Sequence, residues 1–440
     1  MIKKIAKYIT LALLVVAFIY GIGRLSVVMY DSYLFVERQP YLQNATQHSI
    51  EVMWQSEEAE EGCVAYSRED SIPKKMQKIC DESSTRYHHI KIDGLEPTTD
   101  YTYTVASTSL KIDNEGRYFT TLTDDLNATQ NIWILGDSGN HNSAQAEVRD
   151  AMMGYLKGDK INVWLMLGDN AYRSGTQKQF NRGLFEPYKE ILKHNVLWPV
   201  IGNHDARRWA FYNIFSLPTQ GEAGGVPSAS EKYTSFNSGN VHFVLLDSET
   251  EDRSSSGDMA KWLKKDLADN KLLWTIAIFH HPPYSKGSHD TDSYYDSRGR
   301  MVQMRENIVP ILEQHDVDVV LSGHSHVYER SLLSHKQYDY SDTFDAKKHV
   351  VQDDLHHYRK CNQKVAFGGT IYNVAGSSSE DQHGINPFNV KHPMLPISFF
   401  STGSLLIKTS SNKLVSTFVL RDGKILDTYT ITKSIEACKK

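Results

Sequence analysis

The sequence predicts two domains of different fold class, an antiparallel β-sandwich followed by an α/β domain. Residues 37–123 contain short segments of alternating polarity, such as 49–54 and 101–105, with turn residues between them, which is typical of antiparallel strands. Residues 130–436 instead alternate nearly continuous apolar runs with helical spacing, which predicts buried strands joined by helices. The polar stretch 123–129 is the predicted linker. A length of 440 residues suits two domains and one additional segment.

The additional segment is residues 1–30. Lys3, Lys4 and Lys7 precede an apolar run over residues 8–22, an order typical of a signal peptide or a signal anchor. No Ala-x-Ala cleavage site follows, so an uncleaved membrane anchor is favoured, with secretion as the alternative if the segment is removed. The lysines predict a cytoplasmic N-terminus, with the rest of the chain exported and outside the cytoplasm.

Composition and cysteine content limit the classes of function. The net charge is −5 and no basic patch dominates, so no nucleic-acid partner is expected. The four cysteines, Cys63, Cys80, Cys361 and Cys438, form no Cys-x-x-Cys pair, which excludes a zinc ribbon or a thioredoxin-type motif. In an exported chain we expect Cys63 to pair with Cys80 within the first domain and Cys361 with Cys438. Unpaired buried thiols are the alternative.

Five of the predicted core strands end in a polar cluster. These clusters are Gly136-Asp137-Ser138-Gly139, Gly168-Asp169-Asn170-Ala171-Tyr172, Gly202-Asn203-His204-Asp205, His280-His281-Pro282-Pro283 and Gly323-His324-Ser325-His326. Each motif alone is typical of a turn or a helix cap. Ligands in open α/β sheets bind at the carboxyl ends of the strands, however, so five such clusters together predict one converging site.

The order of these five motifs resembles the signature of the purple acid phosphatases, which are calcineurin-like metallophosphoesterases. The run from Gly323 to Arg330 is similar to the last motif of that family, and Tyr172 separates it from relatives without a tyrosine ligand. The resemblance implies a four-layer αββα metallophosphoesterase domain over residues 130–436. The Gly-Leu-x-Pro turn at 94–97, followed by a Tyr-x-Tyr segment, makes residues 37–123 resemble a fibronectin type III module.

The resemblance also implies a dinuclear metal centre. The residues it assigns to the first metal are Asp137, Tyr172 and His326, and those it assigns to the second are Asn203, His280 and His324, with Asp169 bridging the two. A phenolate suits Fe(III), whereas amide oxygen and imidazole suit a divalent Fe, Zn or Mn ion. Two such metals clamp a phosphoryl group and generate the metal-bound hydroxide that attacks phosphorus.

Three further residues are candidates for catalysis. His204 is not in a ligand position and is the first candidate to stabilise the phosphate or protonate the leaving oxygen. Asp205, where the family usually has Glu, is expected to hold and polarise that imidazole. His289 stands at the spacing of the family's second catalytic histidine, although a solvated loop residue is the alternative. Asp290 departs from the family, which carries a further histidine there.

The predicted function is metal-dependent hydrolysis of phosphate monoesters of the acid phosphatase type, acting on phosphorylated small molecules. The alternative on the same scaffold is a phosphodiesterase or nucleotidase, a choice that depends on the loops at 173–189 and 207–230. A membrane-anchored binding module with a decayed catalytic domain is a third hypothesis. It is disfavoured because every ligand position is filled.

Overall fold

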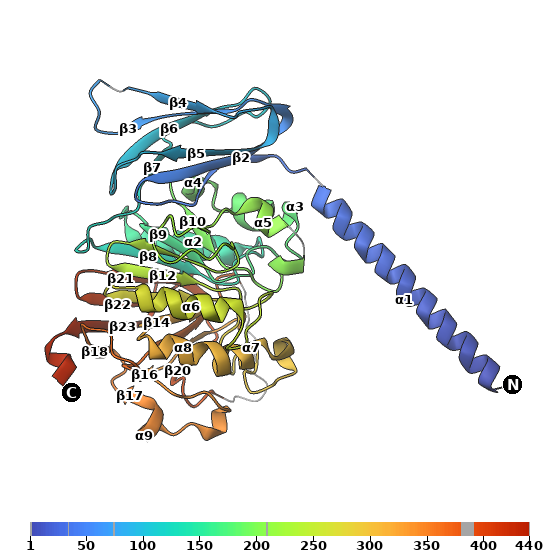
Figure 1. Cartoon of the computed structure of the whole chain (residues 1–440), viewed down its shortest axis with the longest axis vertical. Helices are drawn as coiled ribbons and strands as arrows, with labels where there is room; N and C mark the ends of the chain where they lie inside the picture. The colour runs from blue at the N-terminus through green and yellow to red at the C-terminus, as the bar shows by residue number, and fades with distance from the viewer. Residues whose placement is uncertain (1, 34, 74, 208–209, 380–390, 440) are drawn as a thin grey trace.

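The computed structural model describes residues 2–33, 35–73, 75–207, 210–379 and 391–439. Helix α1 (Ile2–Tyr33) extends away from the body of the protein, and the apolar side chains between residues 8 and 22 are exposed (Figure 1). Within the described ranges, no helix combines the length and the apolar character needed to cross a membrane. The side chains of residues 1–7 and 24–33 lie outside the described ones, and the signal segment stays a prediction.

The N-terminal domain is built from two antiparallel sheets. The first contains β1 (Arg38–Gln43), β2 (Ser49–Glu60) and β5 (Thr85–Asp93), and the second contains β4 (Gln77–Cys80), β3 (Cys63–Arg68), β6 (Asp100–Ala106) and β7 (Tyr118–Thr120), each in this order. The alternating sequence explains the arrangement, because Tyr101, Tyr103 and Val105 of β6 are buried whereas the residues between them are exposed or half-buried. Apolar side chains of both sheets share one core.

Two disulfides tie the chain together. Cys63 and Cys80 join the neighbouring strands β3 and β4, and Cys361 and Cys438 join the end of β18 (His357–Cys361) to the C-terminal turn η6 (Glu436–Lys439). Both predicted pairings are confirmed, and the alternative of unpaired thiols is wrong.

The second domain contains two seven-stranded sheets. The first has the order β10 (Leu197–Pro199), β9 (Val163–Met166), β8 (Gln130–Leu135), β21 (Gly403–Thr409), β22 (Lys413–Leu420), β23 (Ile425–Ser434) and β18. The second has the order β11 (Thr234–Ser238), β12 (Val241–Leu245), β13 (Trp274–Ile278), β14 (Val319–Ser322), β19 (Ile371–Ala375), β15 (Tyr328–Arg330) and β20 (Ile397–Phe399). Strands β8 to β10 are parallel to one another, as are β12, β13, β14 and β19.

Helices cover the outer face of each sheet, so the domain has four layers (Figure 1). Helix α2 (Ser143–Leu156) buries Val148 and Met152 against the first sheet, and α6 (Asp258–Asp269) buries Met259 and Leu263 against the second with α8 (Val309–Gln314) beside it. The core between the sheets includes side chains of β8, β13 and β21.

Short elements connect these layers. They are α3 (Gln177–Phe180), η1 (Asn181–Phe185), α4 (Lys189–Leu192), η2 (Asp205–Arg207), α5 (Ala210–Ile214), η3 (Asp296–Gly299), α7 (Arg300–Gln303), η4 (Met304–Ile308), β16 (Leu333–Ser334), η5 (Ser341–Thr343), α9 (Ala346–His349) and β17 (Val350–Gln352). The carboxyl ends of β8, β9, β10, β13 and β14 are followed directly by the five polar motifs. The two sheets therefore deliver all five motifs to one edge of the sandwich.

Candidate metal centre

One group of side chains gathers around Asp137, which follows β8. The hydroxyl of Tyr172 donates to Asp137 Oδ1 at 3.2 Å and lies 3.3 Å from His326 Nε2. The same His326 nitrogen lies 3.4 Å from Asp137 Oδ1. A carboxylate oxygen, a phenol oxygen and an imidazole nitrogen thus point at a common position. This is the donor set of a hard, highly charged cation.

A second group gathers around His280, which follows β13. Its Nε2 lies 3.0 Å from Asn203 Oδ1 and 3.6 Å from Asp169 Oδ1, and its Nδ1 lies 2.9 Å from the carbonyl oxygen of Leu167. Both ring nitrogens therefore face oxygen acceptors. Burial lowers the pKa of His280, but the carboxylates of Asp169 and Asp137 outweigh burial and raise it. A cation between Nε2 and the two oxygens would satisfy all three atoms.

The two groups meet at Asp169. One ligand atom from each of Asp137, Asp169 and His280 lies within 4.8 Å of the other two, and all three side chains are buried. This spacing fits a pair of metal ions, which lie about 3.5–4 Å apart in two-metal sites.

His324 completes the second group from the end of β14, the strand beside β13 in the second sheet. Its backbone N–H donates to Asp137 Oδ2 at 2.8 Å, and its ring lies 4.9 Å from that of His280. Its Nε2 contacts Ser297 Oγ at 2.6 Å, which leaves Nδ1 as its ligand atom. The structure thus brings all seven predicted ligands into one cluster.

Glycines allow the loops of the cluster to approach closely. Gly168 has φ +95°, and a Cβ atom there would lie 2.5 Å from Nδ1 of His280. A Cβ atom on Gly202 would lie 2.2 Å from the backbone nitrogen of Asp169. A larger residue at either position would push a ligand aside, which explains why each of these motifs begins with glycine.

His204 lies beside the cluster but not within either group. Its backbone N–H donates to Asp169 Oδ1 at 2.8 Å, and its Nδ1 lies 2.8 Å from the carbonyl oxygen of Arg173. The ring is 4.5 Å from that of Tyr172, its side chain is 23% exposed, and Nε2 is 3.9 Å from Asp169 Oδ2. Nε2 is therefore the ring atom on the metal side.

Asp205 does not hold the imidazole of His204 as we expected. Its buried carboxylate accepts hydrogen bonds from the backbone N–H groups of Gly202, Asn170 and Ala171 and from the Asn170 side chain, at 2.9–3.1 Å. The turn η2 directs the carboxylate inward, where it joins the second and third motifs. Burial and the nearby Asp169 carboxylate raise the pKa of Asp205. Asp205 therefore holds the loops of the second and third motifs together.

His289 reaches the cluster from the loop after β13. Its ring stacks on that of His324 with centroids 3.9 Å apart, and its Nδ1 lies 2.8 Å from Asp296 Oδ1. Asp290 turns away from the cluster and pairs with Lys286. His289 is therefore not a solvated loop residue, which was the alternative. Its side chain is 31% exposed.

Sequence reasoning missed three polar residues around the cluster. Asp296 and Ser297 in η3 contact His289 and His324, and Ser248 Oγ lies 2.9 Å from Nδ1 of the buried His281. The ring of His281 lies 4.4 Å from that of His324, so it does not face away from the site. For Asp296 and Ser297 the available signal was the polar composition of residues 284–297.

Comparison with known proteins identifies relatives of this chain among the phosphoesterases. Residues 130–328 match the family model for calcineurin-like phosphoesterase. Purple acid phosphatase 22 of Arabidopsis thaliana is 29% identical over 256 residues, which is 56% of this chain and 54% of the relative. Purple acid phosphatase 13 of the same plant is 25% identical over 428 residues, covering 86% of this chain and 67% of the relative. The chain spans little more than half the length of several of these relatives.

Solved structures share the fold. The purple acid phosphatase from yellow lupin (Lupinus luteus) seeds superposes with a TM-score of 0.70 at 17% identity, covering 91% of this chain and 75% of the lupin chain. PhoD superposes with a TM-score of 0.62 at 13% identity, covering 90% of each chain. Residues 130–328 therefore match the calcineurin-like phosphoesterase model, and the chain is similar in sequence to purple acid phosphatases.

Proposed function

We propose that this protein hydrolyses phosphate monoesters of small molecules at a dinuclear metal centre. The observation that carries the proposal is the meeting of two donor groups at Asp169, with ligand atoms of Asp137, Asp169 and His280 within 4.8 Å of one another. The family match and the purple acid phosphatase relatives support a phosphoric ester hydrolase.

The donor atoms fit two unlike metals. Asp137, Tyr172 and His326 offer a carboxylate, a phenolate and an imidazole, which suit Fe(III). Asn203, His280 and His324 offer an amide oxygen and two imidazoles, which suit a divalent Fe, Zn or Mn ion. Bound metals would supply Lewis acidity toward the phosphoryl oxygens and activate a water molecule for attack on phosphorus.

The two accessory histidines serve proton transfer and charge stabilisation in this proposal. Nδ1–H of His204 donates a hydrogen bond to the Arg173 carbonyl oxygen. Nε2 is therefore the atom that would protonate the leaving oxygen. Asp296 fixes His289 in the same way, through Nδ1. Asp205 acts indirectly, because it positions the loops that carry Asp169 and Asn203.

The test compares two substrates. Turnover of 4-nitrophenyl phosphate by the purified protein should exceed that of bis(4-nitrophenyl) phosphate. The opposite order would favour the alternative, a phosphodiesterase or nucleotidase on the same scaffold, and absence of turnover on both with metals bound would refute the proposal. The loop 207–230, on which this choice depends, includes residues 208 and 209, which lie outside the described residues.

Two further features belong to the proposal. The strand orders β1-β2-β5 and β4-β3-β6-β7 support a fibronectin type III-like domain over residues 37–123, ahead of a catalytic domain over 130–436. The two disulfides support export to an oxidising compartment. The basic and apolar segment 1–30 serves as signal peptide or membrane anchor in that route.

A further inference from the structure

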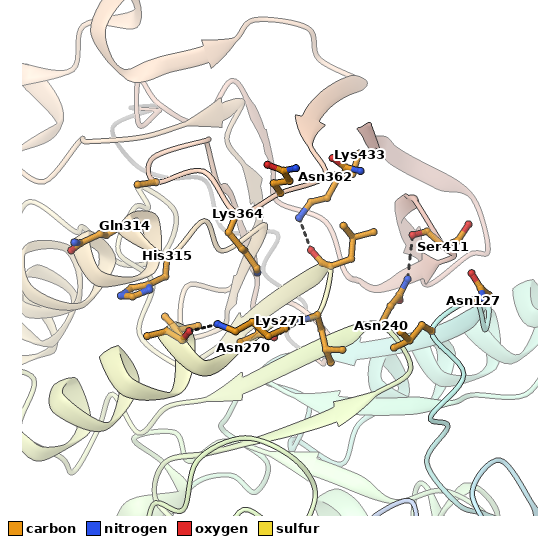
Figure 2. A pocket seen from close by; sticks show the side chains of 17 residues that line it. Asn127, Asn240, Asn270, Lys271, Gln314, His315, Asn362, Lys364, Ser411 and Lys433 are labelled. Carbon is orange, nitrogen blue, oxygen red and sulfur yellow. Dashed lines mark hydrogen bonds between the residues drawn. The ribbon is translucent and has the colours of Figure 1, made fainter. Parts of the chain in front are cut away.

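A cavity of about 740 Å³ lies at the edge of the sheets opposite the metal ligands (Figure 2). Its walls come from the start of β12 and β13, the ends of α6 and α8, and the loops that hold Asn362 and Ser411. The metal ligands follow the carboxyl ends of the strands, whereas this cavity lies at their amino ends. Its volume falls in the range of small-molecule sites, about 300–1,000 Å³.

The titratable side chains on the described walls are all basic: Lys271, His315, Lys364 and Lys433. The remaining polar lining consists of amides and a hydroxyl, and no carboxylate is among the described lining residues. This lining is unusual for a chain with a net charge of −5. It makes the cavity a local site of positive charge.

For two of the lysines, contacts within the protein account for the position of the ammonium group. Lys433 Nζ lies 2.7 Å from Asp318 Oδ1 and donates to the Leu273 carbonyl at 2.6 Å. Lys271 Nζ donates to the Ala268 carbonyl at 2.9 Å, at the C-terminal end of α6, where a cation offsets the helix dipole. Neither lysine requires a ligand.

Lys364 is different. Its ammonium donates to Thr275 Oγ1, but among the described residues it has no carboxylate within ion-pair distance. The carboxylates behind the wall, Asp316 and Asp318, are engaged at 2.7–2.9 Å by Lys360 and Lys433. Lys360 and Lys433 are buried, whereas Lys364 is an exposed residue on the cavity side. Three ammonium groups therefore face two carboxylates, and Lys364 is the one that no described carboxylate pairs.

A second polar group on the cavity wall also lacks a partner. Asn240 is 4% exposed, and no group of the described residues forms a hydrogen bond with its Oδ1, whereas its Nδ2 lies 3.2–3.3 Å from the carbonyl oxygens of Ser410 and Ser411. An unsatisfied buried acceptor destabilises the folded protein. A ligand that combines an anionic group with a hydroxyl would satisfy both Lys364 and Asn240.

We propose that this cavity binds a small oxyanion, held by the Lys364 ammonium, at a site separate from the metal centre. The shared ligand chemistry is a phosphate, sulfate or carboxylate group, free or on a small hydroxylated molecule. The proposal does not depend on the proposed catalytic function, because none of the described lining residues belongs to the proposed metal centre.

The electrostatics of Lys364 agree with this geometry. Burial, opposed by Asp318 and reinforced by Lys433 and Lys360, lowers the pKa of Lys364 to about 8. Burial, and then Lys364 itself, lower the pKa of the neighbouring His315. An oxyanion beside Lys364 would restore its positive charge and reduce its reactivity as a free amine.

Competitive acetylation of the full chain tests the site directly. Acetic anhydride labels unprotonated amines, and mass spectrometry of peptides reports Lys364 separately from Lys261, which is 66% exposed on α6. At pH 8 and constant ionic strength, roughly 10 mM phosphate, sulfate or citrate should slow labelling of Lys364 by about threefold or more and leave Lys261 unchanged. The effective probe identifies the class of oxyanion. Equal labelling of Lys364 with and without all three probes overturns the proposal, as does equal protection of both lysines.

Matched variants provide a second readout. Lys364→Met and Lys261→Met each remove one positive charge. The rise in Tm that the effective oxyanion produces should be smaller in Lys364→Met than in wild type and unchanged in Lys261→Met, since only the first loses the proposed site. An undiminished rise in Lys364→Met would overturn the proposal. Any oxyanion bound at the metal centre contributes equally to all three proteins.

Discussion

The phenol oxygen of Tyr172 lies 3.2 Å from Oδ1 of Asp137, although the two residues follow different strands. Asp137 comes directly after β8, whereas Tyr172 lies in the loop after the neighbouring parallel strand β9. His326 reaches the same position from the second sheet and lies 3.3 Å from the phenol. The contact therefore joins the two sheets at the point where the first metal is proposed to bind.

Tyr172→Phe should remove any visible absorption band of the iron-loaded protein and leave the fold intact. The phenolate is the proposed charge-transfer donor to Fe(III), and phenylalanine keeps the ring but has no oxygen. Absorption spectra of the two iron-loaded proteins, with circular dichroism as the control for folding, measure the effect. A wild-type protein that is colourless with iron bound would show that Tyr172 is not an iron ligand.

His204→Ala should lower kcat by about 10²–10⁴-fold, the usual contribution of a general acid or base. Metal content should stay nearly unchanged, because the side chain of His204 belongs to neither donor group. Steady-state kinetics and metal analysis on the same preparation check both statements. Parallel loss of metal and activity would instead make His204 a ligand or a structural residue.

Asp205→Ala should destabilise the protein and weaken metal binding together. The carboxylate accepts buried hydrogen bonds from Gly202, Asn170 and Ala171, and each donor left without a partner costs about 1–3 kcal/mol. We expect a Tm lower by several degrees and less than two metal ions per chain. A variant with unchanged Tm and metal content but low kcat would contradict the bracing role and favour a direct catalytic role for Asp205.

Lys364→Met should stabilise the protein at pH 7 in buffer without oxyanions. The pKa of Lys364 is about 8 in the folded protein against a model-peptide value of 10.5, so folding disfavours its charged form. That cost is fully present below pH 8 and disappears as the pH rises to about 10.5. Because Lys364 is exposed and solvent screens its charge, we expect a small gain in stability at pH 7 that is lost above pH 10.

Urea unfolding of both proteins across pH 7 to 10.5 measures this difference. The charged groups that face Lys364, which are Asp316, Asp318, Lys360, Lys433 and His315, are common to both proteins and cancel to first order. A variant less stable than wild type at pH 7 would show that Lys364 is compensated in the folded protein.

The clustering of the proposed metal ligands could be predicted from the sequence because each follows a buried strand within a few residues. Once Asp137, Asp169 and His280 are placed at parallel strand ends, the sheet geometry brings them together. The direction of the Asp205 side chain could not be predicted in this way. It depends on the turn η2, and the donors it meets come from Asn170 and Ala171 in another loop.

The polar residues around His324 and the cavity beside Lys364 could not be predicted from the sequence either. Ser297 and Asp296 reach the imidazoles only because η3 turns sharply there, with Ser297 at φ +49°. Lys364 becomes a cation without a described carboxylate partner only where β13, the end of α8 and the loop after β18 meet. No local pattern of residues encodes such a meeting of distant segments.

The most direct test of the central claim is the number of metal ions bound per chain. Elemental analysis of the purified full-length protein should find two ions per chain, one of them iron, with the mixed donor set as the reason for two unlike sites. An active protein that contains no bound metal, or a single ion at full activity, would contradict the dinuclear centre.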